Sequence, residues 1–211
     1  TTLFRSFSTF NTTTFQPGNF VGFKNYIRVL NDPHFWTSLK VTALYMVIAI
    51  PVQLIIGIMI AYIISVDWPG SKIVRALFLI PMVITPVVVG STWKMLLDPL
   101  WGQYNQVIVA LGGSPIHWLG NPKLALLSII IIDTWRETPF VILIVQAGIA
   151  SMDQEPLEAA KVDGANLFQR IMLVEIPMMR DVILSALIIR WLIAIKMFDI
   201  IFTTTRGGPG N

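Results

Sequence analysis

The side chains that could do chemistry in this chain lie mostly inside apolar stretches. One group falls within about one helical turn and consists of Asp133, Arg136 and Glu137. Arg136 can pair with Asp133, because residues three apart share a helix face. A second group, further along, consists of Arg190, Lys196 and Asp199. Such groups indicate either a polar path for a solute or ion pairs that satisfy one another at a helix contact or near the membrane interface.

Four polar or aromatic side chains in the same stretches are further candidates for the wall of a solute path: Tyr45, Gln53, Trp135 and Phe140. Sugars are bound by aromatic faces combined with polar groups. Tryptophan is equally common as an ordinary anchor at the membrane interface. Both interpretations stay open at the level of sequence.

The sequence lacks the residues that several kinds of chemistry require. The chain has no cysteine, which excludes a disulfide framework, a thiolate zinc site and an iron–sulfur cluster. His34 and His117 stand beside prolines in expected loops, where we expect no ligand role. There is no phosphate-binding loop and no zinc-protease motif. We therefore expect no catalysis, no metal and no directly bound cofactor.

The composition places the chain in the membrane class. It is 55% hydrophobic and 13% charged, whereas soluble domains are about a quarter charged. The net charge of +3 is small and the basic residues are scattered, which argues against nucleic acid as a partner.

The expected fold is all-α, a polytopic bundle of transmembrane helices in one domain covering residues 1–211. The segment 41–66 carries no charge, and it is longer than the about 20 apolar residues that a helix needs to cross a bilayer. Residues 76–97 contain Pro81 and Pro86, which predict a kinked helix. The segments 124–150 and 182–203 are interrupted by the charges above, each of which costs about 3 kcal/mol at mid-bilayer.

The polar stretch 151–181 is expected to be cytoplasmic, because it and loop 67–75 are denser in Lys and Arg than the opposite side. Pro156 suits a first helical turn, Gly164 a helix stop and Asn166 the cap of a second helix, which Pro177 is expected to end. The pattern therefore predicts two short helices that meet at a glycine bend. Such a pair could couple the spans to a soluble partner, or lie on the membrane as an amphipathic element.

The same stretch resembles the "EAA…G" loop of ATP-binding-cassette importer permeases. The matching residues are Glu158-Ala159-Ala160, Asp163-Gly164-Ala165 and Pro177. Residues 19–26, Phe198-Asp199 and the glycine-rich residues 207–210 resemble flanking motifs of carbohydrate-type permeases, especially the maltose-F-like member. Ile171 and Ile176 depart from the family pattern conservatively.

The resemblance implies the type I importer permease fold in a multi-pass protein of the bacterial inner membrane. It implies a second, maltose-G-like permease, two ATP-binding subunits that hold the ATP, an extracytoplasmic solute-binding protein and the lipid bilayer as partners. The residues implied to dock on the ATPase are Glu158, Ala159, Ala160, Asp163 and Gly164. The family has six or more spans, so we expect the first and last to be missing, as the absence of an initiator Met also suggests.

Two other classes of protein remain as alternatives. A secondary transporter or channel would show inverted repeats, and no internal repeat is evident. A membrane-embedded enzyme would need a cluster of acid and base groups, for which the sequence offers only Asp133 and Glu137. The sequence favours the importer permease and does not identify its solute.

Overall fold

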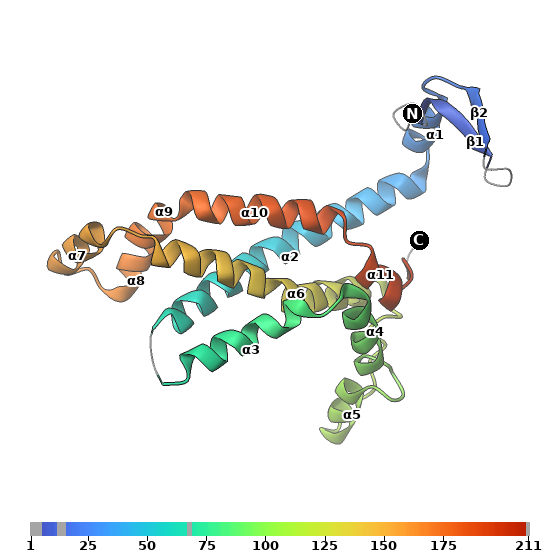
Figure 1. Cartoon of the computed structure of the whole chain (residues 1–211). Coiled ribbons are helices and arrows are strands. Elements are labelled where there is room, and N and C mark those ends of the chain that lie inside the picture. Colours follow the sequence, from blue (N-terminus) through green and yellow to red (C-terminus); the bar gives the residue numbers. More distant parts are fainter. Residues whose placement is uncertain (1–5, 12–15, 67–68, 210–211) are drawn as a thin grey trace. The chain divides into compact units, whose positions relative to one another are not determined.

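The computed structural model describes residues 6–11, 16–66 and 69–209, and these are very largely helical, as expected (Figure 1). The chain forms two compact units that divide between Leu44 and Tyr45. Helix α2 (Pro33–Ser65) contributes residues to both of them.

The first unit contains two short strands that the all-α prediction did not include. They are β1 (Ser8–Asn11) and β2 (Gln16–Phe20), which pair antiparallel. Helix α1 (Lys24–Leu30) follows. The Phe7 ring packs at 5.4 Å from the rings of Phe23 and Tyr26. These ring contacts hold the segment before β1 against the start of α1.

The second unit carries the remaining helices. They are α3 (Ser71–Val83), α4 (Pro86–Leu96), α5 (Gln103–Ala110), α6 (Pro122–Ala150), α7 (Gln154–Val162), α8 (Leu167–Arg170), the π-helix η2 (Ile171–Glu175), α9 (Ile176–Met178), α10 (Arg180–Ile195) and α11 (Asp199–Thr204).

Helix α2 contains the uncharged segment predicted to cross the membrane. Among the described residues, it is the one single helix that is long and apolar enough to do so. Pro51 lies inside it without ending it, as is tolerated in membrane helices whose neighbours satisfy the freed carbonyl.

The predicted kinked span over residues 76–97 is instead two helices. Helices α3 and α4 are each too short to cross alone and are long and apolar enough only when taken together, and they meet at an angle of 95°. Ile84 and Thr85 have extended backbones between them. Pro86 explains the break, because a proline disfavours helical conformation in the residue before it.

Helix α6 matches the predicted segment 124–150 closely. The Asn121 side chain caps it by accepting hydrogen bonds from the backbone N–H groups of Lys123 and Leu124. The predicted segment 182–203 is divided, because α10 ends at Ile195 and α11 begins at Asp199. Helix α11 then packs on α4, where a Cβ on Gly90 would lie 1.9 Å from the Thr203 hydroxyl oxygen. This close approach explains why a glycine stands there.

The core of the second unit lies between α2, α6 and α10. Tyr45, Met46 and Ile50 of α2 pack with Ile129 of α6 and Ala194 of α10. Nearer the α2 C-terminus, Ala61 and Ile64 pack with Val141, Ile142, Val145 and Met179. Small residues allow this close contact, since a Cβ on Gly57 would lie 2.6 Å from Val141 Cγ1.

Helices α7 to α9 gather at one end of the second unit, together with the C-terminal end of α2 and the N-terminal end of α3 (Figure 1). Helices α4, α5 and α11 lie at its other end. The polar stretch 151–181 and the loop 98–123 therefore occupy opposite ends of the helices between them, as the predicted topology requires.

Candidate functional site: a glycine bend and a buried charge network

The stretch 151–181 begins as two helices around a glycine, as the sequence predicted. Glu155 lies in the first turn of α7 and Lys161 in its last turn, where each complements the helix dipole. Gly164 then turns the chain with a φ of +79°, a conformation that favours glycine. Asn166 caps α8 in a capping box, in which its side chain and that of Gln169 each accept a backbone N–H at 2.9 Å.

The residues predicted to dock on an ATPase lie around this bend. Glu158, Ala159, Asp163 and Gly164 are exposed, whereas Ala160 is buried against the chain. A Cβ on Gly164 would meet no heavy atom within 4 Å, so the bend projects into open space. We call the bend and its flanking helices α7 and α8 the coupling loop.

Large apolar side chains flank the bend and lack cover. Val162, Leu167 and Phe168 are 88%, 64% and 68% exposed. An exposed group of this kind marks a surface for binding another protein or a membrane. Nothing in the spacing of the sequence indicated that these three apolar side chains would face outward.

Beyond α8 the structure departs from the prediction. The helix does not stop at Pro177 but continues through η2 and α9, and the break comes at Met179. Pro177 therefore stands inside a continuous helical run, two residues after the end of η2 and two residues before the break. Glu175, the last residue of η2, is 4% exposed and pairs with Arg170 at 2.7 Å.

The charges inside the spans meet in a network between α2, α6 and α10. Asp133 Oδ2 accepts hydrogen bonds from the Tyr45 hydroxyl at 2.5 Å and from Gln53 Nε2 at 2.7 Å. Arg190 Nη2 donates to the same oxygen at 2.9 Å. One carboxylate oxygen thus joins three side chains from two other helices.

The network continues from Arg190 to Glu137. Arg190 Nε donates to Gln53 Oε1 at 2.9 Å. Arg190 Nη1 lies 3.1 Å from Glu137 Oε2, as an ion pair without the geometry of a hydrogen bond. Glu137 also contacts the Arg136 guanidinium. The network therefore contains two acidic and two basic side chains, whose formal charges sum to zero. Arg190 is fully buried within it. Buried charges persist when they are paired and hydrogen-bonded in this way.

The predicted pair of Asp133 and Arg136 does not form. Asp133 pairs with Arg190 instead, and Arg136 pairs with the adjacent Glu137. Spacing along one helix indicated a possible partner within α6, but the packing of α10 supplies a nearer one. The structure brings together four of the predicted path residues with Arg136 at their edge: Gln53, Asp133, Glu137 and Arg190.

The other predicted path residues lie apart from the network. Lys196 and Asp199 are exposed beyond the end of α10, and no ion pair joins them in the described structure. Trp135 is 41% exposed and belongs to an aromatic group, with the Trp93 ring 5.8 Å from it and the Tyr104 ring stacked on Trp93 at 5.8 Å.

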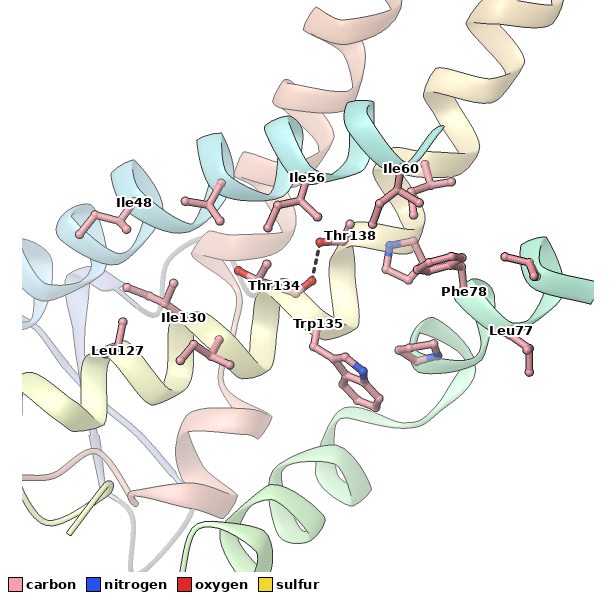
Figure 2. Close-up of a pocket in the computed structure, with 16 residues that line it drawn as sticks. Ile48, Ile56, Ile60, Leu77, Phe78, Leu127, Ile130, Thr134, Trp135 and Thr138 are labelled. Atoms are coloured by element: carbon pink, nitrogen blue, oxygen red, sulfur yellow. Dashed lines mark hydrogen bonds between the residues drawn. The ribbon is translucent and has the colours of Figure 1, made fainter. Parts of the chain in front are cut away.

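Trp135 also borders a groove of about 860 Å³ between α2, α3 and α6 (Figure 2). Its lining is almost entirely apolar and includes Ile48, Ile56 and Leu127. The Thr138 hydroxyl donates to the Thr134 carbonyl at 2.6 Å and is therefore already engaged. Such a lining does not suit a strongly hydrated solute, because it cannot replace lost hydrogen bonds to water.

The fold and these sites define an α-helical membrane protein with a capped, exposed bend at one end of its helices. Comparison with known proteins identifies the family to which this membrane protein belongs. Residues 53–210 match the family described as the binding-protein-dependent transport system inner membrane component. The chain belongs to this family of transport permeases.

Several relatives carry names that specify sugars. The chain is 37% identical to the trehalose/maltose transport system permease protein MalF of Thermococcus litoralis, over 94% of this chain and 68% of the relative. It is 32% identical to the trehalose transport system permease protein SugA of Mycobacterium tuberculosis, over 91% of this chain and 61% of the relative. The chain thus spans about two thirds of these relatives.

A solved structure confirms the fold independently. It is the crystal structure of a bacterial ABC transporter involved in the import of the acidic polysaccharide alginate. The TM-score is 0.80 at 23% identity, over 88% of this chain and 66% of that one. At this identity the likeness concerns the fold alone.

Proposed function

We propose that this chain is part of a permease that imports a sugar or related carbohydrate through the bacterial inner membrane, driven by ATP. The observation that carries the proposal is the exposed glycine bend of the coupling loop, at one end of a bundle whose family transports solutes with binding proteins. Relatives named for trehalose and maltose transport support a carbohydrate as solute.

In this proposal the bend is the point at which a separate ATPase subunit pushes on the permease. Glu158 and Asp163 supply polar contacts, and Ala159 and Gly164 allow close approach, while Ala160 packs against the chain and supports α7 from behind. Val162, Leu167 and Phe168 add apolar area, since all three are exposed. ATP binds on the two partner ATPase subunits. A second permease completes the path, and an extracytoplasmic binding protein delivers the solute.

The polar path is proposed to run beside the charge network rather than through the apolar groove. The side chains of Asp133 and Arg190 are 4% and 0% exposed and satisfy each other, so they are suited to fixing the wall. Arg136 is the network member that reaches the edge, with 17% of its side chain exposed and an Nε atom without a hydrogen-bond partner. Arg136 is therefore the side chain we propose to meet the solute. Gln53 and Glu137 support it, while Trp135, Lys196 and Asp199 stay candidates at the periphery.

The coupling assignment has a matched test. Gly164 and Gly112 both have positive φ, at +79° and +85°, and neither would place a Cβ within 4 Å of another atom. Gly164→Arg and Gly112→Arg therefore impose similar backbone strain, but only the first alters the coupling loop. The complete transporter is reconstituted in proteoliposomes, and sugar uptake and ATP hydrolysis are measured.

We expect Gly164→Arg to abolish ATP-dependent uptake while sugar binding to the external receptor is unchanged, and Gly112→Arg to retain uptake. Normal uptake by Gly164→Arg would overturn the coupling assignment. Uptake that ignores ATP and follows an ion gradient would instead identify a secondary transporter.

A further inference from the structure

One carboxylate in the stretch 151–181 differs from its neighbours. Asp153, Glu155, Glu158, Asp163 and Asp181 are all exposed, as solvated loop charges usually are. Glu175 is 4% exposed and lies at the C-terminal end of η2, which joins the coupling loop to α9 and α10. A buried carboxylate needs a compensating partner.

That partner is Arg170, the last residue of α8. Arg170 Nε donates to Glu175 Oε1 at 2.7 Å across a separation of five residues. In an α-helix, residues five apart are offset by about 140° around the axis, so such a pair would not face each other. In a π-helix the backbone itself closes bonds from i to i+5, which brings these positions together. The spacing of the ion pair therefore matches the geometry of the π-helix.

The pair also borders the membrane helices. The Tyr62 side chain of α2 packs on the core that contains Val145 and Met179. Its hydroxyl interacts electrostatically with the carboxylate of Glu175 and with the guanidinium of Arg170. It is buried and forms no direct hydrogen bond in the described structure. The Arg170–Glu175 pair thus stands between the coupling loop and the end of α2.

We propose that Glu175 is a positioning residue for energy coupling, which acts through Arg170 to hold η2 in its π form. The pair keeps α8 at a fixed angle to α10 and to Tyr62 of α2, so a push on the glycine bend reaches the spans as a rigid-body movement. Without the pair, η2 bends as a hinge, and movement of the glycine bend is no longer transmitted to the spans. ATP is then hydrolysed with little transport. The inference rests on the proposed role of the coupling loop.

The test measures sugar uptake and ATP hydrolysis together in proteoliposomes that contain the complete transporter. Glu175→Gln and Arg170→Gln each remove one charge of the pair. We expect the sugar transported per ATP hydrolysed to fall about tenfold, because hydrogen bonds to charged groups contribute about 1.4 kcal/mol or more. The reversed pair, Arg170→Glu with Glu175→Arg, should recover most of the ratio.

Arg180 and Asp181 provide the matched control. They form an ion pair at 3.4 Å in the same stretch, but their side chains are 78% and 83% exposed. Arg180→Gln and Asp181→Asn change the charge by the same amounts and should leave the ratio unchanged. If Glu175→Gln does not assemble, Arg170→Gln carries the test, because its side chain is partly exposed.

An unchanged ratio in Arg170→Gln overturns the inference, as does an equal fall in the Arg180 and Asp181 variants. The two proposals fail separately. If Gly164→Arg abolishes uptake while the Arg170 and Glu175 variants couple normally, only the positioning role is lost. If Gly164→Arg transports normally, the coupling loop itself is wrongly assigned.

Discussion

Arg190 and Asp133 stand 57 residues apart in the chain, yet their side chains meet at 2.9 Å with exposed fractions of 0% and 4%. The contact ties α10 to α6, and Tyr45 and Gln53 extend it to α2. A helix bundle in lipid gains little from apolar contact alone, because lipid tails are equally apolar. A polar junction of this kind therefore specifies which helices are neighbours.

The first prediction concerns that junction. Arg190→Met removes the cation and leaves the Asp133 charge buried, which should cost about 3–5 kcal/mol of unfolding free energy. Adding Asp133→Asn restores the charge balance, because Glu137 keeps Arg136. The double variant should therefore be more stable than Arg190→Met alone, as measured by thermal unfolding of purified protein in detergent. A double variant that is less stable would contradict the proposed balance.

A second prediction isolates the Tyr45 hydroxyl, which donates to Asp133 at 2.5 Å. Tyr45→Phe keeps the ring and removes this bond to a charged group, at a cost of about 1.5–3 kcal/mol. Tyr104→Phe is the control, because Tyr104 is 44% exposed. Unfolding in detergent should show a lower midpoint for the Tyr45 variant only. Equal midpoints in both variants would argue that the hydroxyl contributes nothing.

The third prediction tests the close approach of α2 and α6. A Cβ on Gly57 would lie 2.6 Å from Val141 Cγ1, so Gly57→Ala should force the helices apart and cost about 1–3 kcal/mol. Val141→Ala in the same molecule removes the Cγ1 atom but keeps the Val141 Cβ, which would lie 2.7 Å from the new Cβ, so it should restore only part of the loss. Gly120→Ala is the control, because the nearest heavy atom to its Cβ would be the His117 Cβ at 3.5 Å. Failure of Val141→Ala to help would locate the strain elsewhere.

A fourth prediction concerns pH. Backbone N–H groups of Trp101 and Leu100 hydrogen-bond to Asp98 and hold the pKa of its carboxyl below the usual value. A depressed carboxyl pKa means that the ionised form stabilises the folded turn above the unfolded pKa of about 3.9, and that this contribution is lost as pH falls through the folded value.

Asp98→Ala should therefore weaken protection of the Leu100 and Trp101 amides near neutral pH. The difference from the unaltered chain should shrink as the carboxyl becomes protonated in acid. Hydrogen exchange followed by mass spectrometry across a pH series measures it, after correction for the intrinsic exchange rate. A difference that grows on acidification would contradict the assigned sign.

Local signals in the sequence were sufficient for several elements. The uncharged stretch around Pro51 predicted α2, and the order of Pro156, Gly164 and Asn166 predicted the coupling loop with its bend and cap. These features depend on residues a few positions apart. The docking role of Glu158 and its neighbours stays a prediction.

Features that depend on packing could not be predicted in the same way. The prolines of residues 76–97 indicated a kink, but the 95° angle between α3 and α4 is set by where each helix packs. The partner of Asp133 comes from α10, which no spacing within α6 could indicate. The π-helix before Pro177 coincides with the Arg170–Glu175 contact, and α-helical geometry would not predict a contact at a spacing of five residues.

The balance of charge in the network has an electrical consequence. Moving one elementary charge through the membrane field requires about 2.3 kcal/mol per 100 mV. The network joins Asp133 and Glu137 to Arg136 and Arg190, so its acidic and basic groups cancel. When α2, α6 and α10 shift together along the membrane normal, these four groups carry no net charge through the field. A movement of this kind would therefore neither draw on the membrane potential nor be opposed by it.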